Sequence, residues 1–178
     1  MSPELEHIRK EVERLTRHWS EAEWRRALPG KWSRGQVLKH LLLSYSGTTD
    51  DLLRAMEAGR PLVSKPTSVD RVRTLWIAKL GFLPSGEIFP KYGFSGEGIE
   101  KDSLRRFYDA LVALDATLSE AERRFGPRAK LLEHPALGSL TAADWRQLHR
   151  AHTKRHLKEI ARRERDAEVR FPDCEFSH

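Results

Sequence analysis

The chain of 178 residues is 39% hydrophobic and contains five Trp, so it can bury the core of one domain, which excludes a disordered protein. The net charge of +6 comes from 32 basic and 26 acidic residues that are interspersed along the chain, which favours a solvated surface over a nucleic-acid-binding stripe. Because Cys174 is the single cysteine and the chain has neither a signal core nor a run of about 18 apolar residues, we expect a cytoplasmic protein without disulfides or membrane segments.

The first part of the chain predicts two helices. Apolar residues at helical spacing predict a helix over residues 3–18. Ser33 and Gln36 then have the types and spacing of a capping box, in which each side chain binds the backbone N–H of the other residue. We therefore expect a second, longer helix from Ser33 to Gly59, with a first half that is apolar on nearly all sides and buried.

Residues 59–100 are rich in proline and glycine and differ from the helical segments on either side. This segment is far longer than a normal loop, so it is predicted to cross the molecule or to cover a site. We expect one short helix within it, near residues 68–80.

Two more helices are predicted to complete the chain. One covers residues 102–125, and the other covers 142–165 and begins after a capping box formed by Thr141 and Asp144. No segment carries a strand signal. Four long helices with one long crossover between the second and the third predict an all-α fold, a four-helix bundle that forms a single domain over residues 1–178.

His152 and His156 are four residues apart in the last predicted helix, so they lie one turn apart on the same face. Two imidazoles in this arrangement can bind one metal ion through bonds of about 2.0–2.1 Å. Trp145, Leu148 and Ile160 share that face and indicate that it points to the core. A third ligand from another helix would leave a coordination position open for catalysis.

His40 is the candidate third ligand, because it lies in the apolar first half of the predicted buried helix. Three charged histidines would be costly to bury, whereas one metal ion would use the lone pairs of all three. His149 lies three residues before His152 on the same face and is an alternative ligand or a pocket residue. Glu159 is predicted either to orient an imidazole or to form an ion pair at the surface.

Other catalytic constellations are disfavoured. Zinc peptidases of the His-Glu-x-x-His class need a glutamate directly after the first histidine, where this chain has Thr153. A di-iron centre needs Glu-x-x-His on each of two paired helices, a pair that the chain lacks. The sequence also contains neither a glycine-rich phosphate loop nor a Gly-x-Ser-x-Gly motif.

Two stretches of the chain resemble DinB-like proteins. Residues 30–41, which include Trp32, Ser33 and His40, resemble the segment that opens the second helix of this superfamily and supplies its first metal histidine. Residues 134–157 look like the final loop and helix of the same superfamily, which supply the other two histidines. The likeness is nearest to an uncharacterised bacterial branch.

The resemblance implies a four-helix bundle, often a homodimer, with nickel or zinc held by His40, His152 and His156. Characterised relatives include thiol-dependent S-transferases, so the resemblance implies a metal-dependent transferase that uses a low-molecular-weight thiol and acts on a small molecule. Because water at the open position of such a metal would also lose a proton more readily, a hydrolase is expected as well. The alternative is a non-catalytic module that binds a metal or a partner. Four further residues are candidates for the pocket from their predicted positions: Trp32, Ser44, Tyr45 and Thr48.

Overall fold

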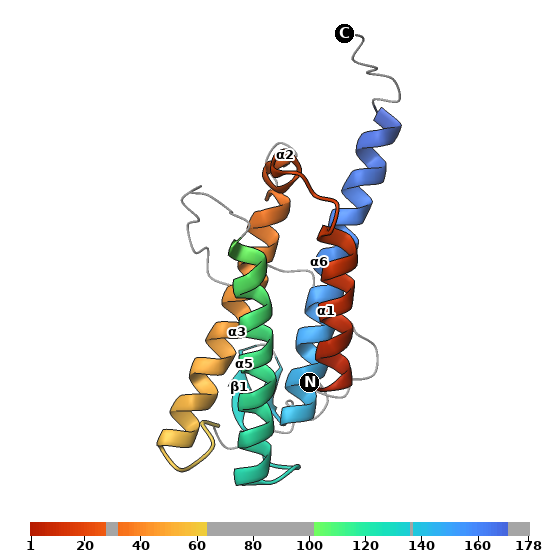
Figure 1. Cartoon of the computed structure of the whole chain (residues 1–178). Coiled ribbons are helices and arrows are strands. Elements are labelled where there is room, and N and C mark those ends of the chain that lie inside the picture. Colours follow the sequence, from red (N-terminus) through yellow and green to blue (C-terminus); the bar gives the residue numbers. More distant parts are fainter. Residues whose placement is uncertain (28–31, 64–101, 136, 171–178) are drawn as a thin grey trace.

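The computed structural model describes residues 1–27, 32–63, 102–135 and 137–170, and within them the protein is mostly helical (Figure 1). The described elements are α1 (Pro3–Thr16), α2 (Glu21–Arg25), α3 (Arg34–Glu57), α5 (Asp102–Phe125), β1 (Leu132–His134), β2 (Gly138–Leu140) and α6 (Ala142–Arg170). The short helix predicted near residues 68–80, and Cys174, lie outside the described residues.

The four predicted long helices are confirmed, and two of them begin at the predicted capping boxes. At the start of α3, Ser33 N donates to Gln36 Oε1 at 2.7 Å and Gln36 N donates to Ser33 Oγ at 3.2 Å. At the start of α6, Thr141 N and Asp144 Oδ2 are 2.9 Å apart, and Asp144 N donates to Thr141 Oγ1 at 3.1 Å. The last helix continues to Arg170, five residues beyond its predicted end.

The short helix α2 was missed by the sequence prediction although its signal is present. Ser20 and Glu23 form a third capping box, with Ser20 N donating to Glu23 Oε2 at 2.8 Å. Glu23 also accepts a hydrogen bond of 3.2 Å from Arg34 Nη1, on the first residue of α3. This hydrogen bond therefore holds α2 against the N-terminal end of α3, the end nearer to His40.

The expectation that the chain has no strands was wrong. β1 and β2 pair in an antiparallel hairpin in which Leu132 lies opposite Leu140. Gly138 has a φ of 71°, a left-handed conformation that glycine adopts without strain. Leu62, which follows α3, donates from its N–H to Leu131 O at 2.9 Å and so adds to the hairpin. Strands of three residues are too short to produce a readable alternation of apolar and polar side chains.

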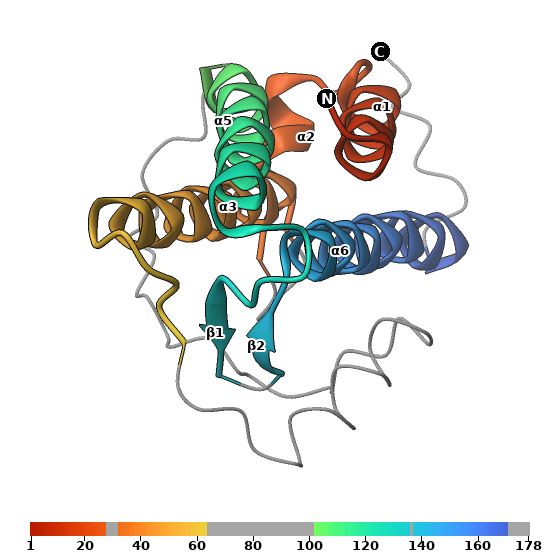
Figure 2. The same ribbon diagram turned by 90° about the horizontal axis from the view of Figure 1, so that it is seen from below.

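The long helices lie side by side in pairs, with α3 along α5 and α1 along α6. Seen along the helices, the hairpin lies beside α3 and α6, on the side away from α1 and α5 (Figure 2). α3 and α5 run in the same direction, so α3 ends and α5 begins at opposite ends of the molecule. α3 and α6 run in opposite directions and are in contact, and His40 of α3 lies close to His152 of α6.

The core is continuous between the long helices and the hairpin. Its fully or almost fully buried residues come from every one of these elements, and they include Leu5, Leu41, Leu111, Leu132 and Leu148. Burial of these apolar stripes is the main force that holds the helices at fixed positions. Within the described residues, no helix combines the length and the apolar character that crossing a bilayer requires.

Candidate metal centre

The centre is built from one histidine of α3 and two histidines of α6. The prediction that one face of α6 points to the core is confirmed, because Trp145, Leu148 and Ile160 are at most 7% exposed. His152 is 8% exposed on this face, and His156 is partly buried one turn further on. The helix α3 is fixed at its start by the capping box at residue 33, two turns before His40, which is also partly buried.

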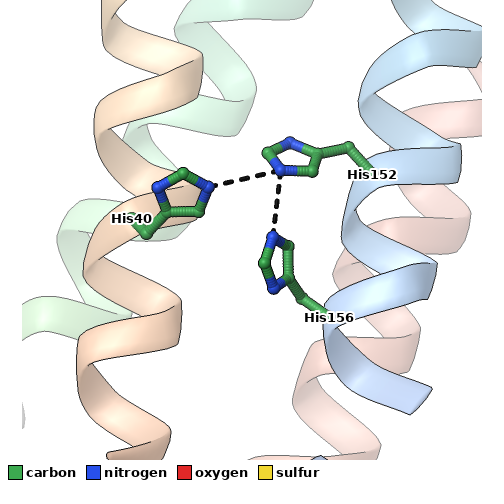
Figure 3. Close-up of side chains that lie close together, drawn as sticks. All are labelled: His40, His152 and His156. Carbon is green, nitrogen blue, oxygen red and sulfur yellow. Dashed lines mark hydrogen bonds between the residues drawn. The ribbon is translucent and has the colours of Figure 1, made fainter. Parts of the chain in front are cut away.

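The three imidazoles point towards one another across the space between α3 and α6 (Figure 3). Nε2 of His152 lies 3.3 Å from Nε2 of His40 and 3.0 Å from Nε2 of His156. One ligand nitrogen from each of the three histidines lies within 4.8 Å of the other two. The structure therefore brings together the three residues that the sequence proposed, although 112 positions separate His40 from His152.

The spacing of these nitrogens fits the ligands of a small divalent ion. Metal–nitrogen bonds of about 2.0–2.1 Å at tetrahedral angles place two ligand nitrogens about 3.3 Å apart. The two Nε2–Nε2 distances that involve His152, 3.0 and 3.3 Å, are close to this value. Imidazole nitrogens are suitable donors for zinc, nickel and copper, so both the donors and their spacing are those of a site that can hold such an ion.

The protonation of the group also suits metal binding. Burial lowers the pKa of His40, and burial followed by the proximity of His156 and His40 lowers the pKa of His152 to about 2. Both rings are therefore neutral at physiological pH, and a neutral imidazole has the lone pair that a metal ion requires.

Hydrogen bonds account for only one of the two short contacts at His152. A neutral imidazole nitrogen carries either one proton or one lone pair, so Nε2 of His152 makes one good hydrogen bond along its ring axis. Here the same atom faces two other imidazole nitrogens, those of His40 and His156. A cation between the three rings would use a lone pair from each of them.

His149, which the sequence offered as an alternative ligand, lies outside the group of three histidines. It is 2% exposed, and its Nε2 lies 3.2 Å from Oγ1 of Thr48 on α3. Its ring contacts those of Tyr45 and Trp145, with centroids 5.0 and 5.8 Å away. Burial, and after it the proximity of His134, lowers the pKa of His149 to about 3, so this ring is also neutral.

Trp32 is the pocket candidate that lies at the candidate centre. Its ring centroid is 5.1 Å from that of His40, and the residue is 41% exposed. Tyr45 and Thr48 are buried between α3 and α6, and the carbonyl of Ser44 accepts a hydrogen bond of 3.1 Å from Thr48 Oγ1. Glu159 is partly buried on α6, and its predicted role stays a prediction.

Thr153 occupies the position of the glutamate base of His-Glu-x-x-His peptidases, and its side chain points elsewhere. It is 1% exposed, and its hydroxyl oxygen forms a hydrogen bond with the hydroxyl of Tyr45. The sequence shows that Thr153 excludes this peptidase class, but its contact with Tyr45 of α3 was not predicted. His134 of the hairpin was also missed; it is buried, and its ring centroid lies 5.9 Å from that of Trp145.

Residues 100–163 match the model of a family that is described as a protein of unknown function (DUF1569). The matched stretch includes α5, the hairpin and most of α6, and so contains His152 and His156 but not His40. The comparisons with curated proteins and with solved structures gave no match.

Proposed function

We propose that this protein is a DinB-like four-helix-bundle enzyme that binds one divalent ion, nickel or zinc, through His40, His152 and His156. The observation that carries the proposal is the convergence of the three imidazoles, with Nε2–Nε2 distances of 3.0 and 3.3 Å. The pairing of α3 with α5 and of α1 with α6 supports the bundle. A long crossover between α3 and α5 is supported because α3 ends and α5 begins at opposite ends of the molecule.

The reaction that we propose is transfer of a low-molecular-weight thiol to a small electrophilic molecule, or hydrolysis of such a molecule. A divalent ion with three neutral ligands keeps an open position, where it would lower the pKa of a thiol or of water. The three histidines provide this position without adding negative charge, and no carboxylate belongs to the group among the described residues. That donor set favours thiol transfer over hydrolysis assisted by a carboxylate base. We also propose a homodimer, as the likeness to DinB-like proteins implies, and a cytoplasmic location, which the single cysteine favours.

Elemental analysis of the purified native protein tests the metal site. We expect close to one nickel or zinc ion per chain, and loss of that ion in His40→Ala with the helical content retained. His7→Ala is the matched control, because His7 is an exposed histidine on α1. A metal-free native protein that also takes up no added nickel or zinc would remove the proposal.

The reaction itself needs an activity screen of the loaded protein. Thiols of low molecular weight are offered together with epoxides and alkyl halides, and ester and amide substrates are offered with water alone. Thiol adducts that form with the native protein and not with His40→Ala support the transferase. A protein that binds metal and turns over neither substrate class is the non-catalytic module that the sequence left as the alternative.

A further inference from the structure

Besides the histidine group, two buried polar contacts join α3 to α6. The hydroxyl of Tyr45 is hydrogen-bonded to that of Thr153, and Oγ1 of Thr48 lies 3.2 Å from Nε2 of His149. All four residues are less than 9% exposed, and Tyr45 is 0% exposed. We call these two contacts the polar rungs. On α3 the rung residues Tyr45 and Thr48 follow His40, whereas on α6 Thr153 lies between the two histidine ligands and His149 lies about one turn before them.

The direction of the second rung is fixed by its neighbour. Thr48 Oγ1 donates its single proton to Ser44 O at 3.1 Å, so towards His149 it can only accept. The proton of the His149 imidazole is therefore on Nε2, which donates to Thr48. That nitrogen has no lone pair left for a metal, and His149 acts in the contact between the helices.

A gain in stability alone does not account for these rungs. Replacing both partners of a buried hydrogen bond by apolar groups of the same shape is often neutral or stabilising. A directional polar contact differs from an apolar one in specificity, because it is satisfied in only one axial alignment of the two helices. The rungs therefore select one alignment of α3 against α6 from those that the apolar core would accept.

The metal ligands need such an alignment. A shift of one residue along a helix moves a side chain by 1.5 Å and turns it by about 100°. Metal–nitrogen bonds tolerate deviations of about 0.2 Å. His40 and His152 are on different helices, so their separation of 3.3 Å depends directly on the alignment of α3 and α6.

We propose that the Tyr45–Thr153 and Thr48–His149 rungs are positioning contacts that hold α3 in the alignment in which His40 reaches an ion bound by His152 and His156. The Tyr45–Thr153 rung is the one nearer to the metal centre along the chain, because Thr153 directly follows the ligand His152 in α6. This inference rests on the proposed function, since it assigns the rungs a role in binding the same ion.

Tyr45→Phe is the decisive variant, because it removes one hydroxyl group and keeps the ring against Phe107, 5.3 Å away. Zinc affinity is measured by competition with a chromophoric chelator, and ligand geometry by the visible absorption spectrum of the Co²⁺ form. We expect zinc affinity to fall by about 10-fold to 100-fold, as is usual when groups that orient metal ligands are removed. The Co²⁺ spectrum is expected to change as well.

Thr153→Val and Thr153→Ser test the same rung from α6. Val removes the hydroxyl and should weaken zinc binding to a similar degree, whereas Ser keeps the hydroxyl and should retain the native affinity and Co²⁺ spectrum. If Tyr45→Phe does not fold, this pair decides by the same criteria. The double variant Tyr45→Phe with Thr153→Val should lose no more affinity than either single variant, because one rung is lost in each case.

Val12→Ala is the control for a loss of stability alone, since Val12 is fully buried on α1. It should lower stability and leave zinc affinity unchanged. If Tyr45→Phe and Thr153→Val bind zinc and Co²⁺ as the native protein does, the positioning role is overturned while the metal site stands. If the native protein itself binds no metal, both proposals fall together.

Discussion

Nε2 of His40 lies 3.3 Å from Nε2 of His152, although the two residues belong to different helices and are 112 positions apart in the chain. His152 belongs to a pair on one helix, which spacing alone can place on one face. The contact with His40 turns that pair into a group of three that can enclose an ion.

Metal binding should stabilise the folded protein. An ion that binds only the folded state adds about 2.7 kcal/mol when its concentration is 100 times Kd. For a chain of this length, we expect zinc or nickel to raise the Tm of the metal-free protein by roughly 5–10 °C. Thermal unfolding followed by circular dichroism measures the shift. His152→Ala should fold and show almost no shift, and an unchanged shift would place the ion elsewhere.

The fluorescence of Trp32 should decrease when the ion binds. Its ring centroid lies 5.1 Å from that of His40, so an open-shell ion such as Ni²⁺ or Co²⁺ at the centre should quench its fluorescence. We expect Trp32→Phe to abolish most of the quenching that titration produces in the native protein. Trp24→Phe is the control, because Trp24 packs against Trp19 and should leave the quenching intact. Equal quenching in the two variants would contradict the placement.

Acid should destabilise the metal-free protein through His149. Its pKa is about 3 in the folded state because of burial, against an ordinary value of 6.5, so the unfolded chain binds the extra proton between these two values. The stability that neutral His149 contributes is therefore fully present above about pH 6.5 and is lost as the pH decreases towards 3. Between pH 7.5 and 5.0, this residue should account for a loss of roughly 2 kcal/mol in the free energy of unfolding.

Urea unfolding of the metal-free protein at pH 7.5 and pH 5.0 measures this loss. In His149→Gln, which cannot take up the proton, the difference between the two pH values should be smaller by roughly 2 kcal/mol. The other buried histidines remain in this variant, and they account for the pH dependence of stability that is left. An identical pH dependence in the native and variant proteins would show that His149 does not titrate as expected.

Arg146 should matter for stability and not for the metal. It is 11% exposed, and it binds Glu122 at 2.9 Å and lies 3.6 Å from Asp115, which joins α6 to α5. Arg146→Met leaves Glu122 without this cation and leaves Asp115 with only the N-terminal ammonium of Met1, 3.8 Å away. We expect a loss of about 2–3 kcal/mol in the free energy of unfolding. Zinc affinity should stay at the native value, since these ion pairs lie outside the histidine group.

Arg123→Met is the matched control for Arg146→Met. Arg123 pairs with Glu120 three residues earlier on α5, but its side chain is 75% exposed. Exposed pairs of this kind contribute little to stability, because water and salt screen the two charges. Chemical denaturation of both variants gives the comparison, and equal losses would mean that partial burial does not strengthen the contacts of Arg146.

Much of the fold could be predicted from short sequence patterns, because helix caps depend on residues close together in the chain. The capping boxes at Ser33 and Thr141 formed as predicted, because a cap needs only residues three positions apart. The third box, at Ser20, follows the same rule and could have been found. The hairpin could not, since its strands are three residues long and are held by neighbours such as Leu62 that are remote in the chain.

By itself, the sequence determined the helices, the core-facing side of α6, and the pair His152 and His156 on it, because a helical period of 3.6 residues fixes which side chains share a face. Only the tertiary structure decided that His40 meets this pair while His149 turns to Thr48. The separation of α3 and α6, and their axial alignment, depend on packing between residues about 100 positions apart. No local pattern encodes that alignment, and the three imidazoles converge only where the packing sets it.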